Sequence, residues 1–155
     1  MIVDIYIPIW VGNVTIVTKR TEFTENVVRN SLQKYAKIQP DSEKYIEEGT
    51  KVVMEELREF YSNPEWTGGV TITNDGLSFI LLSDFDKDIA NGFNSLTHEI
   101  LHAVIDLLSA KGIKMTAATE EVYTYLMGYI VEEFCKQYFT SSKGVLPSNA
   151  LKETI

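Results

Sequence analysis

The chain has 155 residues, of which 45% are hydrophobic and 23% are charged, as is typical of one compact globular domain. The formal net charge is −8 and the 14 basic residues are scattered, which argues against nucleic acid or an anionic membrane as a partner. Cys135 is the single cysteine, so an internal disulfide is excluded and we expect a soluble cytoplasmic protein.

Residues 1–17 are largely apolar, but Asp4 and Pro8 interrupt them, which favours a pair of strands over a signal peptide or a membrane span. Apolar side chains alternate over residues 3–11 as in a half-buried strand. Gly12-Asn13 predicts a hairpin turn, and the return strand is expected over residues 14–18.

Apolar periodicity and capping residues predict helices over residues 24–36, about 41–61, about 88–110 and about 116–138. Thr24 is the predicted N-cap of the first helix and Thr116 that of the last, while Asp41 or Ser42 caps the second. Gly112 stands just past the end of the third helix, where a glycine commonly ends a helix.

A second hairpin is predicted between these helices, with strands over residues 69–73 and 77–83 on either side of Asn74-Asp75-Gly76. Together the elements predict an α+β domain with a small, largely antiparallel sheet packed against helices. We expect this single domain to span residues 1–139, followed by a flexible tail over residues 140–155.

Within the third predicted helix, residues 98–102 read His-Glu-Ile-Leu-His, which is the pattern H-E-x-x-H. Two histidines four positions apart lie on one helix face, so both imidazoles can reach the same metal ion. Glu99 is rotated about 100° around the helix axis from His98, too far to ligate comfortably but close to the ion's open position. There its carboxylate can take a proton from water and later deliver it to a leaving amine. The pattern predicts a zinc site with His98 and His102 as ligands and Glu99 as general base.

The helix that carries the motif is apolar on most of its circumference. Its narrow polar arc consists of Ser95, His98, Glu99, His102, Asp106 and Ser109. Both histidines of the chain lie in this arc. The alternative is an amphipathic helix whose hydrophilic stripe includes two histidines by chance, but the H-E-x-x-H spacing on a helix favours the metal site.

A catalytic zinc usually needs a third protein ligand and an open position for water. The chain has no further histidine, so a carboxylate is expected, and Glu120 and Glu121 stand at the start of the last predicted helix. Glu121 borders the apolar stripe of that helix and is the preferred ligand, whereas Glu120 points toward solvent. Two alternatives stay open: Glu120 is the ligand, or both acids merely suit a helix N-terminus, where the helix dipole favours negative charge.

His98, Glu99 and His102, followed after 18 residues by Glu121, resemble the gluzincin clan of zinc metallopeptidases. The stretch from Thr119 to Leu126 is also similar to short zincin-like proteins encoded by phages and prophages.

This resemblance covers roughly residues 76–134. It implies a zincin-like fold and a zinc-dependent peptidase that acts on a peptide or protein substrate. It also implies that the two histidines and Glu121 hold Zn2+ and that Glu99 is the general base. The strand over residues 77–83 would be the sheet edge along which an extended peptide pairs.

The chain departs from the gluzincin pattern in two places. Many gluzincins have an aspartate four residues after the ligand glutamate, where this chain has Tyr125. Asn94 or Asp106, each one turn from a motif histidine, could orient the ligands instead, although plain solvent exposure is an equal reading. No histidine remains to stabilise an oxyanion. We therefore expect Tyr125, or else Tyr123 or Tyr129, to donate that hydrogen bond, unless the metal suffices.

Other functions stay open on the sequence. A zincin-like scaffold could be a binding or structural protein of a phage or mobile element, with or without zinc, and an exposed Trp66 would suit that role. A regulatory peptidase with one protein target is a third reading. The tail from residue 140 is long enough to reach the cleft and inhibit the enzyme, although a disordered end is the simpler expectation.

Overall fold

The structure of the protein, a computed structural model, describes residues 1–8, 12–36, 42–63, 68–74, 76–83, 85 and 88–141. Its elements in chain order are β1 (Ile2–Ile7), β2 (Gly12–Val17), the 3-10 helix η1 (Arg20–Glu22), α1 (Glu25–Ala36), α2 (Ser42–Ser62), β3 (Gly69–Asn74), β4 (Leu77–Leu82), α3 (Ile89–Ala110) and α4 (Glu120–Ser141). A small sheet combined with α-helices confirms the predicted α+β class.

The strand order in the sheet is β1-β2-β4-β3, so β1 and β3 are its two edge strands. The pairs β1–β2 and β3–β4 are antiparallel, whereas β2 and β4, which join the two hairpins, run parallel. The sheet is therefore mixed. The prediction that residues 77–83 form the sheet edge is wrong, because β4 lies between β2 and β3. All of β4 is buried, as expected for a near-continuous apolar strand that is covered on both faces.

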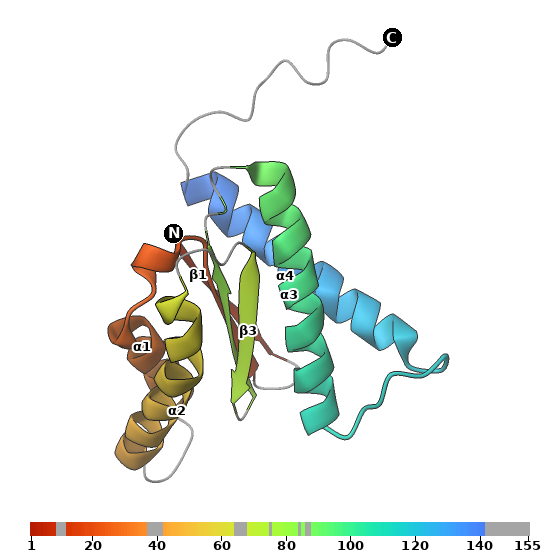
Figure 1. Ribbon diagram of the computed structural model, residues 1–155. Helices are drawn as coiled ribbons and strands as arrows, with labels where there is room; N and C mark the ends of the chain where they lie inside the picture. Colours follow the sequence, from red (N-terminus) through yellow and green to blue (C-terminus); the bar gives the residue numbers. More distant parts are fainter. Residues whose placement is uncertain are drawn as a thin grey trace.

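Helices cover both faces of the sheet, with α1 and α2 on one side and α3 and α4 on the other (Figure 1). Successive side chains of a strand point to opposite faces, so the sheet contributes to two separate cores. The core beneath α3 and α4 includes Val3, Ile5, Ile16, Ile80, Leu96, Ile100, Ile130 and Phe134. The core beneath α1 and α2 includes Leu32, Val53, Leu57, Phe60, Ile72, Phe79 and Leu81. The helix α3 packs on β3 and β4, and α4 packs on β1.

The two hairpin turns differ in how well the sequence predicts them. The turn predicted at Gly12-Asn13 is wrong, because these residues already belong to β2 and pair with Ile7 and Tyr6. Pro8 follows the last residue of β1 and has no N–H to continue the ladder, which places the connection earlier than the glycine. The second turn is confirmed. Asn74 pairs with Leu77, and Gly76 has a φ of 82°, the left-handed conformation that this turn requires.

The helix α3 begins and ends close to the predicted residues. The Asp88 side chain accepts a hydrogen bond from the backbone N–H of Asn91 at 3.2 Å, which makes Asp88 the N-cap. At the other end Gly112 has a φ of 77°, and the N–H of Ile113 returns to the carbonyl of Leu108 at 2.9 Å. This is a Schellman-type end, in which the predicted glycine satisfies the last carbonyl groups.

The helix α4 begins later than predicted. It starts at Glu120, so the prediction of Thr116 as its N-cap is wrong. Instead, the Thr119 hydroxyl accepts a hydrogen bond from the backbone N–H of Thr116 at 2.9 Å and donates one to the carbonyl of Lys114 at 2.6 Å. These local bonds hold residues 116–119 in a turn, because a threonine hydroxyl competes with the helical ladder for backbone partners.

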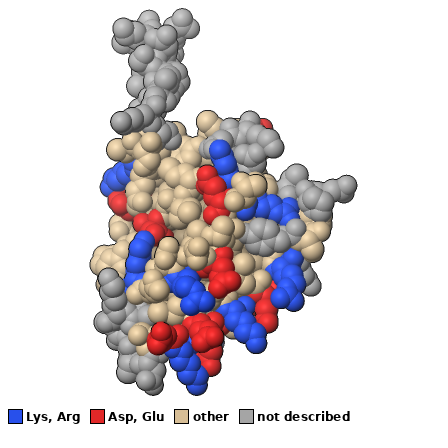
Figure 2. Space-filling view, turned by 90° about the vertical axis from the view of Figure 1, so that its left-hand side faces the viewer, with Lys and Arg blue, Asp and Glu red and all other residues tan. Residues whose placement is uncertain are grey.

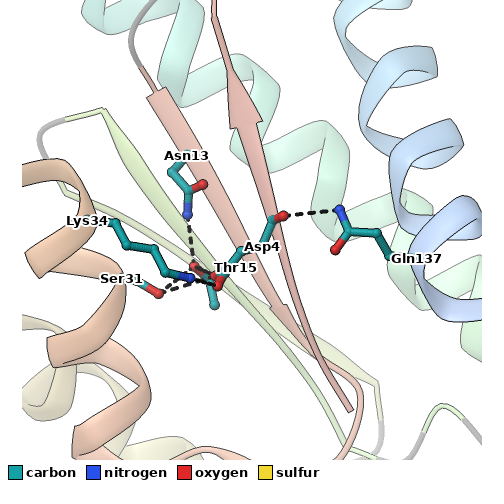
Figure 3. A network of polar contacts seen from close by, with 6 residues as sticks. All are labelled: Asp4, Asn13, Thr15, Ser31, Lys34 and Gln137. Carbon is teal, nitrogen blue, oxygen red and sulfur yellow. Dashed lines mark hydrogen bonds and ion pairs between the residues drawn. The ribbon is translucent and has the colours of Figure 1, made fainter. Parts of the chain in front are cut away.

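A polar network around Asp4 fastens helices from both layers to the sheet (Figure 3). The Asp4 carboxylate accepts hydrogen bonds from the hydroxyls of Thr15 at 2.8 Å and Ser31 at 3.3 Å, and it pairs with the ammonium of Lys34. On the other side, Gln137 of α4 donates to the backbone carbonyl of Asp4 at 3.1 Å. The network explains why a charged residue is tolerated in β1, since each oxygen that leaves water finds a donor.

The face seen in Figure 2 carries lysines and arginines interspersed with acidic residues. Within the described ranges, no helix combines the length and apolar character that crossing a membrane demands. The predicted tail over residues 140–155 lies largely outside the described residues, which end at Ser141, the last residue of α4. The same holds for Asp41 and Trp66.

Candidate metal centre

The helix α3 holds its two histidines on the side that faces away from the sheet. Its buried residues, which include Leu96, Ile100, Ala103 and Leu107, point toward the sheet, whereas His98 and His102 are exposed. The apolar periodicity of the sequence thus fixes the rotation of the helix and presents the motif to solvent.

The two imidazoles point toward each other. The Nε2 atoms of His98 and His102 lie 3.1 Å apart, and their ring centroids are separated by 4.7 Å at an interplanar angle of 77°. Two nitrogens that bind one tetrahedral zinc, each at about 2.0–2.1 Å, lie roughly 3.3 Å apart. The two nitrogens, which are within hydrogen-bond distance of each other, therefore have a chemistry and a spacing that fit a zinc ion, as expected for histidines at i and i+4 of a helix.

Glu99 occupies a different environment from its neighbours. The residue is only 7% exposed, because its side chain packs between α3 and the edge strand β3. The hydroxyl of Thr71 in β3 lies 2.8 Å from the carboxylate Oε2 of Glu99 and 2.9 Å from its backbone carbonyl oxygen. The carboxylate thus lies on the side of α3 that faces β3, one position along the chain from His98.

The predicted third ligand is not gathered with the histidines. Within the described part of the chain, no group of three or more His, Cys, Asp or Glu side chains is arranged to hold a metal. Glu120 and Glu121 are both exposed in the first turn of α4, which Figure 1 shows set apart from α3 beyond the connecting segment 111–119. Neither carboxylate has a hydrogen-bond or ion-pair partner among the described residues.

The three tyrosines considered as oxyanion donors have different surroundings. Tyr123 is 2% exposed, and its hydroxyl donates to the carbonyl of Ile113 at 2.7 Å. The hydroxyl of Tyr129 donates to the carbonyl of Tyr6 at 3.0 Å. Tyr125 is 75% exposed, and its hydroxyl makes no hydrogen bond with any described residue. Of the three, Tyr125 alone presents a hydroxyl that a ligand can reach without breaking a bond seen here.

The residues considered as orienting partners for the histidines do not hydrogen-bond to them. Asn94 and Asp106 are both exposed on α3, and in the described structure neither side chain reaches His98 or His102 with a hydrogen bond. Plain solvent exposure of Asn94 and Asp106 therefore accounts for what is observed.

Sequence reasoning missed Thr71 and Gly69, which form the wall against which Glu99 lies. A Cβ atom at Gly69 would stand 2.6 Å from Cγ of Glu99, so only glycine leaves room for that side chain. The alternation of Thr71, Ile72 and Thr73 predicts a strand with a polar face. The local pattern does not predict that this polar face contacts Glu99 of the helix α3.

Comparison with known proteins adds nothing to this geometry, since no protein-family model, curated protein or solved structure matches the chain.

Proposed function

We propose that the protein is a zinc-dependent metallopeptidase of the gluzincin type. The observation that carries the proposal is the pair of exposed imidazoles on α3, whose Nε2 atoms are 3.1 Å apart, together with the nearly buried Glu99 that follows His98 in the chain. Two histidine nitrogens at this spacing can bind one zinc ion, and a neighbouring carboxylate that does not bind the ion can act as general base. These are the elements of a hydrolytic metal site.

His98 and His102 would hold the metal, and a carboxylate from the first turn of α4 would complete the site. Glu121 is our candidate, with Glu120 as the alternative, because both carboxylates are exposed and make no bond to the described residues. Reaching the histidines requires the beginning of α4 to move toward α3, and segment 111–119 is the connection that would permit it. Metal binding that selects such an arrangement would couple the site to the position of α4.

Bound at this site, zinc supplies Lewis acidity and lowers the pKa of coordinated water toward neutrality. Glu99 would accept the proton of the attacking water and return it to the amine of the leaving group. Tyr125, with its accessible hydroxyl, would donate a hydrogen bond to the oxyanion of the tetrahedral intermediate.

An extended peptide would pair with β3, which is the sheet edge beside α3. Ser83 N–H donates to the carbonyl of Gly68, which fixes the alternation of the β3–β4 ladder. The backbone groups of Gly69, Thr71 and Thr73 therefore point away from β4, toward the free edge. Main-chain pairing of this kind binds many sequences and sets the direction of the substrate past the metal.

The test combines metal analysis with one conservative substitution. Protein purified without chelators is expected to contain about one zinc per chain. The variant Glu99→Gln should keep that zinc and lose turnover of a denatured polypeptide by roughly 100- to 10,000-fold, because a general base contributes that much. Glu55→Gln, an exposed position on α2, is the matched control and should behave as wild type.

The third ligand is tested by comparing Glu121→Gln with Glu120→Gln. We expect loss of zinc in the first variant and retention in the second, and the reverse result would assign Glu120. Full activity in Glu99→Gln would remove Glu99 from the mechanism. Zinc without cleavage of any denatured polypeptide or peptide would favour a binding or structural role for the scaffold.

A further inference from the structure

The contact between Glu99 and β3 links the proposed base to the edge strand of the sheet. The Thr71 side chain points toward α3, where its hydroxyl lies 2.8 Å from Oε2 of Glu99. The same hydroxyl is 2.9 Å from the backbone oxygen of Glu99. A hydroxyl can donate its single proton to either oxygen, so both the side chain and the backbone of Glu99 lie within hydrogen-bond distance of the same group, the Thr71 hydroxyl.

Gly69, two residues earlier in β3, provides the space that the glutamate occupies. A Cβ atom there would lie 2.6 Å from Cγ and 3.2 Å from Cδ of Glu99, and 3.0 Å from Cδ2 of Leu82. Leu82 belongs to the buried strand β4 and is 1% exposed, so its side chain lies in a closely packed core. An alanine at position 69 would therefore push the glutamate off the strand.

We propose that Gly69 and Thr71 are positioning residues, which together hold the Glu99 carboxylate in place for catalysis. This inference rests on the proposed function, in which Glu99 is the general base. A free glutamate side chain has three rotatable bonds, and restricting them before the substrate binds removes an entropic cost from the reaction. Gly69 leaves room on one side, and Thr71 supplies the hydrogen bond that selects one orientation.

The position of Thr71 gives this role a second consequence. The backbone groups of Thr71 point toward the free edge of the sheet, where a peptide would pair, while its side chain points toward Glu99. One residue thus sets the distance between the substrate backbone and the proposed base. A catalytic group supported in this way by a rigid strand holds its geometry better than one on a loop.

The substitution Thr71→Val removes the hydroxyl and keeps a β-branched side chain of similar volume in the strand. We expect kcat to fall about 10-fold, with KM changed by less than about 2-fold, because the substrate still pairs while the base is less well placed. Thr71→Ser restores the hydroxyl and should recover most of kcat. Thr50→Val is the matched control, since it removes a buried threonine hydroxyl that bonds the carbonyl of Ile46 in α2.

A second measurement does not depend on activity. In the full-length, metal-free protein labelled with 13C at glutamate carboxyl groups, the Glu99 signal is assigned by its loss in Glu99→Gln. We expect this signal to shift in Thr71→Val and in Gly69→Ala, and to stay in place in Thr71→Ser and Thr50→Val. The Gly69→Ala variant also serves if Thr71→Val does not fold.

The outcomes separate the inference from the function on which it rests. An unchanged Glu99 signal in Thr71→Val, or a normal kcat in that variant while Glu99→Gln is inactive, would overturn the positioning role and leave the peptidase intact. Absence of turnover in the wild-type chain would overturn the peptidase and, with it, the catalytic role of Thr71.

Discussion

The two edge strands of the sheet differ in the hydrogen bonds that they form with the neighbouring helices. At β1, the outward carbonyls of Asp4 and Tyr6 accept hydrogen bonds from Gln137 and Tyr129 of α4, at 3.1 and 3.0 Å. At β3, the neighbouring helix α3 contributes no such donor among the described residues. The hydrogen bond here has the opposite direction, because the Thr71 hydroxyl of the strand donates to Glu99 of the helix.

This difference bears on what each edge can do. An edge strand with free backbone groups invites pairing with another chain, and proteins commonly cover such edges. The helix α4 covers β1 with side-chain donors, so another strand could pair there only by displacing them. The edge at β3 lies beside α3, the helix that carries the histidine pair, and in the proposed peptidase an extended substrate would pair there. In the proposed peptidase, α4 would therefore protect one edge of the sheet, and the other edge would bind the substrate.

Among the tests of this comparison, the largest effect is expected from removing an outward N–H of the β3 edge. Thr73→Pro deletes an outward donor of β3, and proline is tolerated at such a position of an edge strand. We expect kcat/KM for an unstructured polypeptide to fall about 10- to 100-fold, because pairing is blocked at the free edge. The matched variant Tyr6→Pro deletes the equivalent donor of β1 and should leave kcat/KM unchanged.

Circular dichroism and thermal melts of both variants verify that each still folds. Equal loss of kcat/KM in both variants would mean that proline disturbs the sheet as a whole. No loss in Thr73→Pro would show that the substrate does not pair with β3, and the comparison of the two edges would lose its functional meaning.

The sequence predicts the local parts of this arrangement better than the distant ones. The histidine pair depends only on a spacing of four within one helix, so its geometry follows once the helix forms. The second hairpin turn is confirmed for the same reason, since Gly76 supplies its conformation locally. The strand order depends instead on the parallel pairing of β2 with β4, which are separated in the chain by η1, α1, α2 and β3, and no pattern within either strand specifies this pairing.

The same distinction explains the errors at the candidate site. That Glu99 is buried against Thr71 could not be read from the motif, because it depends on which strand lies beside α3. The wrong choice of β4 as the edge came from the resemblance to gluzincins, because the apolar pattern of its residues predicts a strand but does not specify the neighbours of that strand. Whether Glu121 approaches the histidines depends on the path of segment 111–119, and spacing along the chain does not define that path.

A smaller effect is expected from uncovering the β1 edge. Tyr129→Phe and Gln137→Leu each remove one donor to an outward carbonyl of β1. We expect each to lower the free energy of unfolding by about 1 kcal/mol, the usual net contribution of such a hydrogen bond. Because the exposed edge can then pair with a second copy, the double variant should also self-associate more strongly.

Denaturant unfolding and sedimentation velocity measure these two effects. Tyr125→Phe is the matched control, since it removes a hydroxyl from a tyrosine of α4 that is 75% exposed, and it should leave stability unchanged. A double variant as stable and as monomeric as wild type would show that α4 does not protect β1 through these donors.

The smallest effect concerns Cys135, a partly buried residue of α4 that packs against the core beneath this helix. Burial raises the pKa of the Cys135 thiol above its ordinary value. Because the thiolate is the reactive form, a raised pKa leaves less of it at pH 8, and alkylation by iodoacetamide should be slower in the folded protein than in the denatured chain. The Tyr129→Phe, Gln137→Leu double variant should react a few-fold faster than wild type, since a loosened α4 exposes the thiol more often. Equal rates in the two folded proteins would mean that α4 stays seated on β1 without its two donors, and apolar packing alone would then account for the closed edge.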